Sequence, residues 1–182
     1  MMRLATYNVE WFNALFDDNG RLLEDRGWSA RHNITRGEQL AALGIVFTAL
    51  DADAVMVIEA PDGSRVRDGA RALENFAARY GLRARKALIG FQNDTQQKIA
   101  LLYDPDALEA RHDPIGAETG KAGSADAPRF DGVFRRDVDV DAAPERIRFS
   151  KPPLEVALRL RASGAALRLI GVHVKSKAPH GA

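Results

Sequence analysis

Three polar residues in this sequence end or interrupt apolar runs that are typical of β-strands: Asn8, Glu59 and His173. Glu59 closes the run AVMVI at 54–58, whose continuous apolar character favours a strand buried on both faces. The PDG that follows at 61–63 predicts a turn. A carboxylate where a buried strand opens into a loop occupies a position that α/β sheets commonly use for ligands. The alternative is a surface glutamate at the end of a core strand.

Asn8 and His173 lie in segments of the same kind. Asparagine is depleted in strands, and its amide needs hydrogen-bond partners if it is buried. Asn8 therefore either bonds a neighbouring loop or directs its amide at a ligand. His173, in GVHV at 171–174, is either a structural histidine or a functional one. Because α/β sheets bring strand ends together, three such residues on separate strands favour a common site.

The segment between Asn8 and Glu59 has the pattern of a crossover helix. Residues 36–50 predict a helix, with Thr35 and Glu38 in the spacing of a capping box. Its apolar face is expected to carry Leu40, Leu43, Phe47 and Leu50. A strand at 3–9, this helix and the strand at 54–59 would form a right-handed β-α-β unit.

The other elements follow from periodicity and turn residues. A second helix is expected at 64–80, ended by Gly81, and 16–32 is expected to be a loop with at most one helical turn near Leu22. Further strands are predicted at 82–89, 98–103, 107–112, 133–140, 154–160 and 166–174. Ser163-Gly164 predicts a hairpin turn between the last two, and 113–131 predicts a loop. With no internal repeat, residues 1–182 are expected to form a single domain.

The amino-acid composition is that of a globular protein and excludes disulfide-bonded classes and classes with membrane-spanning helices. The chain has 182 residues, 46% hydrophobic and 28% charged, which is typical of a globular domain with its own core. The absence of cysteine excludes disulfides and thiolate metal sites and fits a reducing compartment. No signal-peptide pattern and no membrane-spanning apolar run occur, so a cytoplasmic protein is expected.

The net charge of +1 conceals an asymmetry along the chain. From Arg129 onward there are eleven Lys and Arg residues against six Asp and Glu residues. A basic C-terminal third could face phosphate groups, and it could equally consist of solvated strand edges.

Five segments, in this order, together resemble the endonuclease/exonuclease/phosphatase superfamily, the deoxyribonuclease I-like group. They are TYNVEW at 6–11, VIEA at 57–60, KIALLY at 98–103, FSKPPL at 149–154 and GVHVKSK at 171–177. The resemblance implies an α/β fold, a sandwich of two mixed sheets flanked by helices. It also implies hydrolysis of a phosphate ester with Mg²⁺ or Mn²⁺ as the cofactor.

The resemblance carries roles for individual residues. Glu59 matches the family's metal-ligating glutamate, and Asn8 matches the asparagine that positions the metal and the substrate phosphate. His173 matches a position that contacts the scissile phosphate or assists the leaving oxygen. Lys151 falls where many members carry arginine, so the charge is kept but the bidentate geometry is lost. Lys175 would add charge beside the phosphate, with a solvated lysine as the alternative.

These residue types suit the implied chemistry. Mg²⁺ takes one or two carboxylates, keeps several waters, and lets a phosphate complete its coordination. A bound metal polarises the phosphoryl oxygen and neutralises charge on the leaving group. Histidine donates a hydrogen bond or a proton in the useful pH range.

Two parts of the family pattern do not occur in this sequence: a Gly-Asp-x-Asn segment and a terminal Asp-His pair. The chain therefore resembles the N-terminal portion of such a domain, present as an incomplete sandwich. An incomplete sandwich would expose an apolar sheet face, so a homodimer or a covering partner is expected.

Two functions from different classes remain open. One is a metal-dependent phosphoesterase that acts on DNA, RNA or another phosphodiester. The other is a phosphate- or nucleic-acid-binding module, or a fragment without activity. The resemblance does not choose among DNA, RNA, lipid and inositol phosphates, because one fold hosts many substrates.

Overall fold

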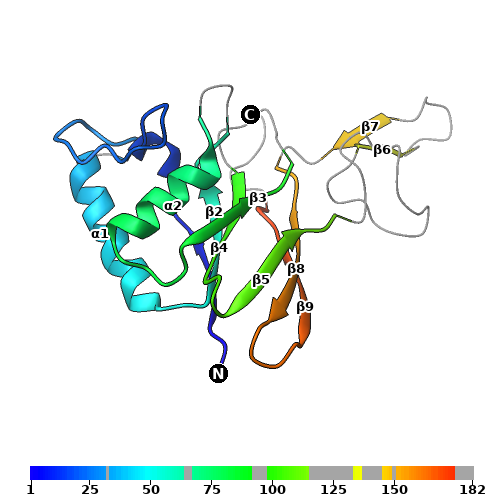
Figure 1. Ribbon diagram of the computed structural model, residues 1–182. Coiled ribbons are helices and arrows are strands. Elements are labelled where there is room, and N and C mark those ends of the chain that lie inside the picture. The colour runs from blue at the N-terminus through cyan, green and yellow to red at the C-terminus, as the bar shows by residue number, and fades with distance from the viewer. Residues whose placement is uncertain are drawn as a thin grey trace.

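The computed structural model describes residues 1–31, 33–63, 67–91, 98–114, 133–136, 145–148 and 151–174. Figure 1 shows three layers: the α-helices on one face of a central sheet, the central sheet itself, and a second sheet on its other face. This mixed α/β arrangement with two packed sheets agrees with the α/β class expected from the sequence.

The central sheet has four strands in the order β1-β2-β4-β3. They are β1 (Leu4–Asn8), β2 (Ala54–Ala60), β3 (Lys86–Ile89) and β4 (Lys98–Tyr103). β1 and β2 are parallel, as expected of a crossover unit, with Asn8 aligned to Ile58. The C-terminal ends of these two strands therefore meet at one end of the sheet. β3 and β4 complete the sheet in antiparallel pairing.

Helix α1 (Arg36–Leu50) connects β1 to β2 and has the bounds that the sequence predicts. Its capping box is confirmed: the Thr35 hydroxyl accepts the Glu38 amide, and the Glu38 carboxylate accepts the Thr35 amide at 2.9 Å. Leu40, Leu43 and Phe47 are buried, so this face packs against the sheet.

The predicted start of the second helix is wrong. Helix α2 (Gly69–Arg79) does not include residues 67 and 68, because the Asp68 carboxylate accepts the amides of Ala70 and Arg71 and so begins the helix. The described part of 16–32 is a loop without a helical turn, which agrees with the prediction of at most one such turn near Leu22. A helical turn that the sequence did not predict, η1 (Phe12–Leu15), precedes this loop. Phe12 and Leu15 are fully buried, so packing rather than local sequence fixes this turn.

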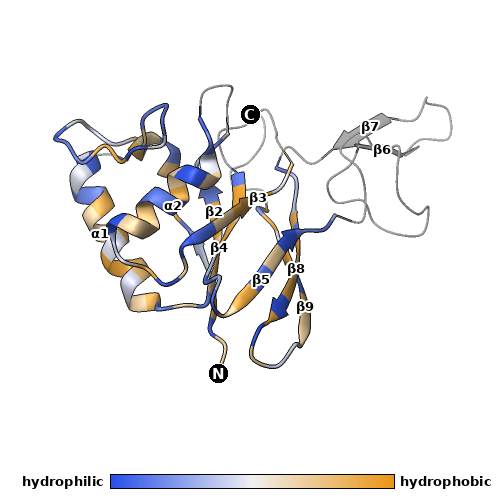
Figure 2. Cartoon of the chain, viewed as in Figure 1, coloured by the Kyte–Doolittle hydropathy of each residue, from blue (hydrophilic) through white to orange (hydrophobic). Residues whose placement is uncertain are grey.

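Strand β2 is buried along its whole length, which confirms the prediction from its apolar run. Val55 and Val57 belong to the core beneath the helices, whereas Ala54, Met56 and Ile58 belong to the core between the two sheets. Figure 2 shows hydrophobic residues along β2 between the two flanking layers. Burying each large apolar side chain contributes about 1.5–3 kcal/mol relative to leaving it in water.

The second sheet has three antiparallel strands in the order β5-β8-β9. They are β5 (Leu108–His112), β8 (Leu154–Leu160) and β9 (Ala166–Gly171), and β8 and β9 form the predicted hairpin. A separate pair consists of β6 (Val133–Arg136) and β7 (Glu145–Arg148).

Strand predictions erred mainly at the ends. β3 begins at Lys86 rather than at 82, because Arg83 before it is held by aspartates at the end of the sheet. β9 ends at Gly171 rather than at 174, so His173 follows the strand instead of lying within it. The predicted strand residues 137–140 and the predicted loop 115–131 lie outside the described residues.

Most of the inner face of the central sheet is covered. Leu154, Val156 and Leu158 of β8 pack against it between the two sheets. Exposed apolar side chains occur on the edge strands: Leu4 of β1 is 41% exposed, and Leu167 and Ile170 of β9 are 39% and 45% exposed. Of the helices in the described part of the chain, none has the length and apolar character needed to cross a membrane.

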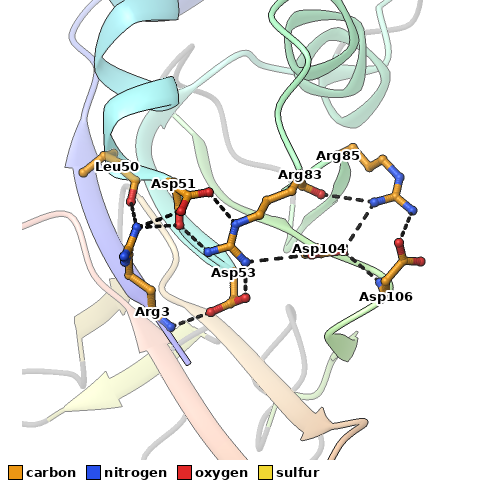
Figure 3. Close-up of polar contacts among 8 residues, drawn as sticks. All are labelled: Arg3, Leu50, Asp51, Asp53, Arg83, Arg85, Asp104 and Asp106. Atoms are coloured by element: carbon orange, nitrogen blue, oxygen red, sulfur yellow. Dashed lines mark hydrogen bonds and ion pairs between the residues drawn. The ribbon is translucent and has the colours of Figure 1, made fainter. Parts of the chain in front are cut away.

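A network of arginines and aspartates closes the end of the sheet where β1 and β2 begin (Figure 3). Asp53 accepts hydrogen bonds from the Arg3 amide and from the Arg83 guanidinium. Asp51 accepts hydrogen bonds from the side chains of the same two arginines, at 2.9 and 2.7 Å. Arg85 continues the network by bridging the other aspartates drawn in Figure 3, Asp104 and Asp106.

Burial opposes the ionised form of Asp53, but the hydrogen bonds from Arg3 and Arg83 outweigh it and hold the pKa of this carboxyl below its usual value. The network therefore stabilises the folded chain with Asp53 ionised.

Candidate functional site

Three of the residues singled out from the sequence come together at the C-terminal end of β2. His173 Nε2 lies 3.5 Å from Glu59 Oε1 and 3.4 Å from Lys151 Nζ. Glu59 comes from β2, Lys151 from the segment before β8, and His173 from the segment after β9. Their separation along the chain means that only the packing of the two sheets brings them together.

Glu59 occupies an irregular backbone position. It has φ of +61°, and the pairing of β2 with β4 shifts register between Ile58 and Ala60, which marks a β-bulge. Bulges redirect a side chain that a regular strand would place differently. A non-glycine residue in the left-handed region carries a cost of about 1–3 kcal/mol, and such positions cluster at functional sites.

The loop beside Glu59 shares this irregularity. Glu10 and Trp11 have φ of +57° and +60°, so this site holds three of the five non-glycine residues with positive φ among those described. The Trp11 amide donates to Glu59 Oε2 at 3.3 Å. On the other side of the turn, Gln39 Nε2 donates to the Glu10 carbonyl at 3.3 Å. The turn is thus fixed from both β2 and α1.

Asn8 ends β1 next to this turn and is exposed. Its Oδ1 accepts the Glu10 amide at 3.1 Å. This bond to a neighbouring loop is the structural alternative anticipated from the sequence. The side-chain NH₂ of Asn8 and a second lone pair on Oδ1 are chemically capable of further hydrogen bonds.

His173 is largely buried, and its surroundings favour the neutral imidazole. Burial lowers its pKa first, the Lys151 ammonium lowers it further, and the Glu59 carboxylate opposes both. Its Nδ1 is buried and has no hydrogen-bond partner among the described residues. Neutral His173 therefore offers one donor and one acceptor, with Nε2 directed at the other two members of the cluster.

The side chains around Glu59 determine which kind of metal site is possible in this cluster. Within the described residues, no group of three or more His, Cys, Asp or Glu side chains could hold an ion. The Glu59 carboxylate is 11% exposed and stands alone as a charged oxygen donor in the cluster. One carboxylate suffices for Mg²⁺ or Mn²⁺ that keeps waters and shares the substrate phosphate. The residues therefore fit a hydrated cation and do not fit a site closed by protein ligands.

Lys175, expected beside the phosphate, lies outside the described residues. Sequence reasoning missed the hydrogen bond from the Trp11 amide and the role of Gln39, because no residue type in this stretch signals a left-handed turn. Gly171 is a further missed contributor. A Cβ built there would lie 2.5 Å from Met56 Sδ and 2.9 Å from Ile99 Cγ2, so glycine lets β9 approach the central sheet two residues before His173.

Comparison with known proteins adds no assignment: no family model matches this chain, and no curated protein matches it.

Proposed function

We propose that this chain is a divalent-metal-dependent phosphoesterase that hydrolyses phosphodiester bonds. The observation that carries the proposal is the convergence of Glu59, Lys151 and His173, from three distant segments, at a strained bulge. A carboxylate, an ammonium group and an imidazole are the groups that a phosphodiester and its metal ion require.

Each residue has a role that its surroundings support. Glu59, with Asn8 beside it, would hold Mg²⁺ or Mn²⁺, which supplies charge neutralisation at the phosphoryl oxygens when bound. Lys151 attracts and orients the phosphate as a point charge. Neutral His173 donates a hydrogen bond from Nε2 to a phosphate oxygen or the leaving oxygen. The Trp11 amide orients the Glu59 carboxylate through Oε2.

Two further features support a place in the endonuclease/exonuclease/phosphatase superfamily. The five ordered sequence segments place Asn8, Glu59, Lys151 and His173 at matching positions. Two packed sheets with helices outside one of them are compatible with a deoxyribonuclease I-like sandwich. DNA or RNA is the proposed substrate class.

The test is hydrolysis of plasmid DNA and of a dinucleotide with Mg²⁺, with Mn²⁺, and with EDTA. Turnover is expected only with metal, and Glu59→Gln is expected to reduce it at least 100-fold, since a metal-anchoring carboxylate is lost. The matched control is Glu109→Gln, an exposed carboxylate on β5 paired with Arg161. Turnover by Glu59→Gln equal to that of the control would overturn the assignment.

A second candidate is a phosphate- or nucleic-acid-binding module without turnover. It is favoured by one observation: within the described residues, Glu59 is the single carboxylate that contacts His173. This candidate predicts salt-dependent binding of DNA that is lost in Lys151→Met, with no hydrolysis in any metal.

A covering partner is proposed for the open edges of the two sheets, with a second copy of the chain as the leading candidate. Leu4 of β1 and Leu167 and Ile170 of β9 are large apolar side chains exposed on these edge strands. Sedimentation velocity is expected to show a dimer that Leu167→Lys dissociates, and a monodisperse monomer would contradict this.

A further inference from the structure

We propose that the indole of Trp11 is a stacking surface for the base of a nucleotide whose phosphate lies at Glu59, Lys151 and His173. This inference rests on the proposed function and adds a residue that would bind the base of its nucleic-acid substrate. Lipid and inositol phosphodiesters lack a flat aromatic group at the corresponding place.

The first support is position. The Trp11 amide donates to Glu59 Oε2 at 3.3 Å, so the indole belongs to a residue in direct contact with the candidate metal ligand. In a nucleotide the base is joined to its phosphate through a single sugar. A base attached to a phosphate at this cluster therefore lies one sugar away from a site that the Trp11 backbone contacts directly.

The second support is the misfit between Trp11 and its local structure. Trp11 is the N-cap of η1 with φ of +60° and makes no side-chain capping hydrogen bond. Glycine, asparagine and aspartate adopt this conformation at less cost, and short polar residues are preferred at N-caps. A bulky aromatic residue here is a conformational outlier that secondary structure does not explain.

The third support is that Trp11 lies outside both hydrophobic cores of the described residues and is half exposed, at 49%. By contrast, the next residue, Phe12, is fully buried among aromatic rings. The chain thus places one aromatic ring in the core and leaves the preceding one accessible beside the candidate site.

The fourth support is rigidity. The turn is held by Asn8 Oδ1 on the Glu10 amide, by Gln39 on the Glu10 carbonyl, and by Glu59 on the Trp11 amide. With its backbone fixed, Trp11 has only two side-chain torsions to order on binding. A rigid aromatic side chain of this kind gives contact area at low entropic cost.

The experiment uses the two tryptophans of the chain, Trp11 and Trp28. In Trp28→Phe the emission reports Trp11 alone, and in Trp11→Phe it reports Trp28, which is 71% exposed. Each variant is titrated in EDTA with a thymidine dinucleotide and with dimethyl phosphate, a phosphodiester without a base. The dinucleotide is expected to quench Trp11 emission and leave Trp28 emission unchanged, and dimethyl phosphate is expected to quench neither.

Affinity is then measured calorimetrically for Trp11→Ala and Trp11→Tyr. Trp11→Ala is expected to bind the dinucleotide about tenfold or more weakly, as removal of a stacking aromatic does, and Trp11→Tyr to retain most of the affinity. Dimethyl phosphate affinity is expected to be unchanged in both. Thermal unfolding followed by circular dichroism establishes that each variant is folded.

Unchanged dinucleotide affinity in folded Trp11→Ala would overturn the stacking inference. A parallel loss of dimethyl phosphate affinity would also overturn it, because the residue would then act only on the structure of the site. Stacking with no hydrolysis in any metal would support this inference while overturning the proposed phosphoesterase activity. Metal-dependent hydrolysis whose KM for the dinucleotide is unchanged in Trp11→Ala would support the phosphoesterase activity and overturn the stacking inference.

Discussion

At the scale of the residue, His173 shows how the candidate site is tuned. It contacts a cation, Lys151, on one side and an anion, Glu59, on the other, in a largely buried position. Burial and the lysine both disfavour a charged imidazole, and the carboxylate favours it. Burial, the largest influence, acts together with the lysine and outweighs the carboxylate, so the pKa of His173 lies below its usual value.

These opposing influences give a prediction for two variants. In the wild type, the His173 pKa measured by NMR in EDTA is expected below its ordinary value of 6.5. Lys151→Met removes a like charge and is expected to raise this pKa. Glu59→Gln removes the opposite charge and is expected to lower it. A pKa that fails to rise in Lys151→Met would contradict the observed contact.

At the scale of the element, the approach of β9 to the central sheet sets the position of His173. Gly171 permits this approach, since an added Cβ would meet Met56 Sδ and Ile99 Cγ2. His173 is not part of β9 but lies two residues beyond Gly171, where the strand ends. The site therefore depends on tight packing between the two sheets.

Gly171→Ala tests this dependence. Overpacking is expected to cost about 1–3 kcal/mol of the free energy of unfolding, measured in urea, and to reduce phosphodiester turnover by moving His173. Val172→Ala is the matched control, because Val172 is 52% exposed and adjacent. A fully active and equally stable Gly171→Ala would show that β9 packing does not position the site.

The elements also show what the sequence could and could not predict. Periodicity gave α1 and β2, because each has a long, regular apolar pattern and α1 has side-chain caps. It did not give η1, since the burial of Phe12 and Leu15 depends on contacts distant in sequence. Periodicity did not predict the start of α2 either, because a side-chain cap, the Asp68 carboxylate, begins this helix.

The candidate site likewise has features that the sequence could predict and features that it could not. Positions at the ends of predicted strands, together with the resemblance, identify four candidate site residues: Asn8, Glu59, Lys151 and His173. The sequence could not predict the bulge at Glu59 or the left-handed turn at Trp11, because these conformations are imposed by neighbouring strands and by Gln39. Whether Asn8 faces a ligand or its own turn was likewise a question of geometry.

At the scale of the whole molecule, charge is arranged at the two ends of the central sheet. One end carries the candidate site, and the other carries the network of Asp53, Arg83 and their neighbours. The network links β1, β2, β3 and β4 at the end of the sheet away from the candidate site. It is therefore expected to contribute to the stability of the fold and not to ligand binding. Substitutions of the buried members of the network, such as Asp53, should therefore affect unfolding rather than phosphate binding.

Acid unfolding tests this separation. The pKa of Asp53 lies below 3.8 in the folded chain, so its contribution is fully present above that pH and is lost as the pH falls through the folded pKa. Asp53→Asn is expected to cost about 1–3 kcal/mol at neutral pH in urea unfolding, with the difference shrinking below about pH 4.

Asp106→Asn is the control for this measurement, because the Asp106 side chain is 78% exposed and its pair with Arg85 is solvated. An exposed pair contributes about 1 kcal/mol or less. A cost of Asp53→Asn that stayed constant between neutral pH and pH 3 would contradict the proposed ionisation of Asp53.

The central claim is that the Glu59 carboxylate anchors a divalent cation, and Mn²⁺ binding followed by electron paramagnetic resonance tests it most directly. Titration of the wild type is expected to show one Mn²⁺ bound per chain, with binding retained in Glu109→Gln and lost in Glu59→Gln. Equal Mn²⁺ binding by Glu59→Gln and the wild type, or no binding by the wild type, would contradict the claim.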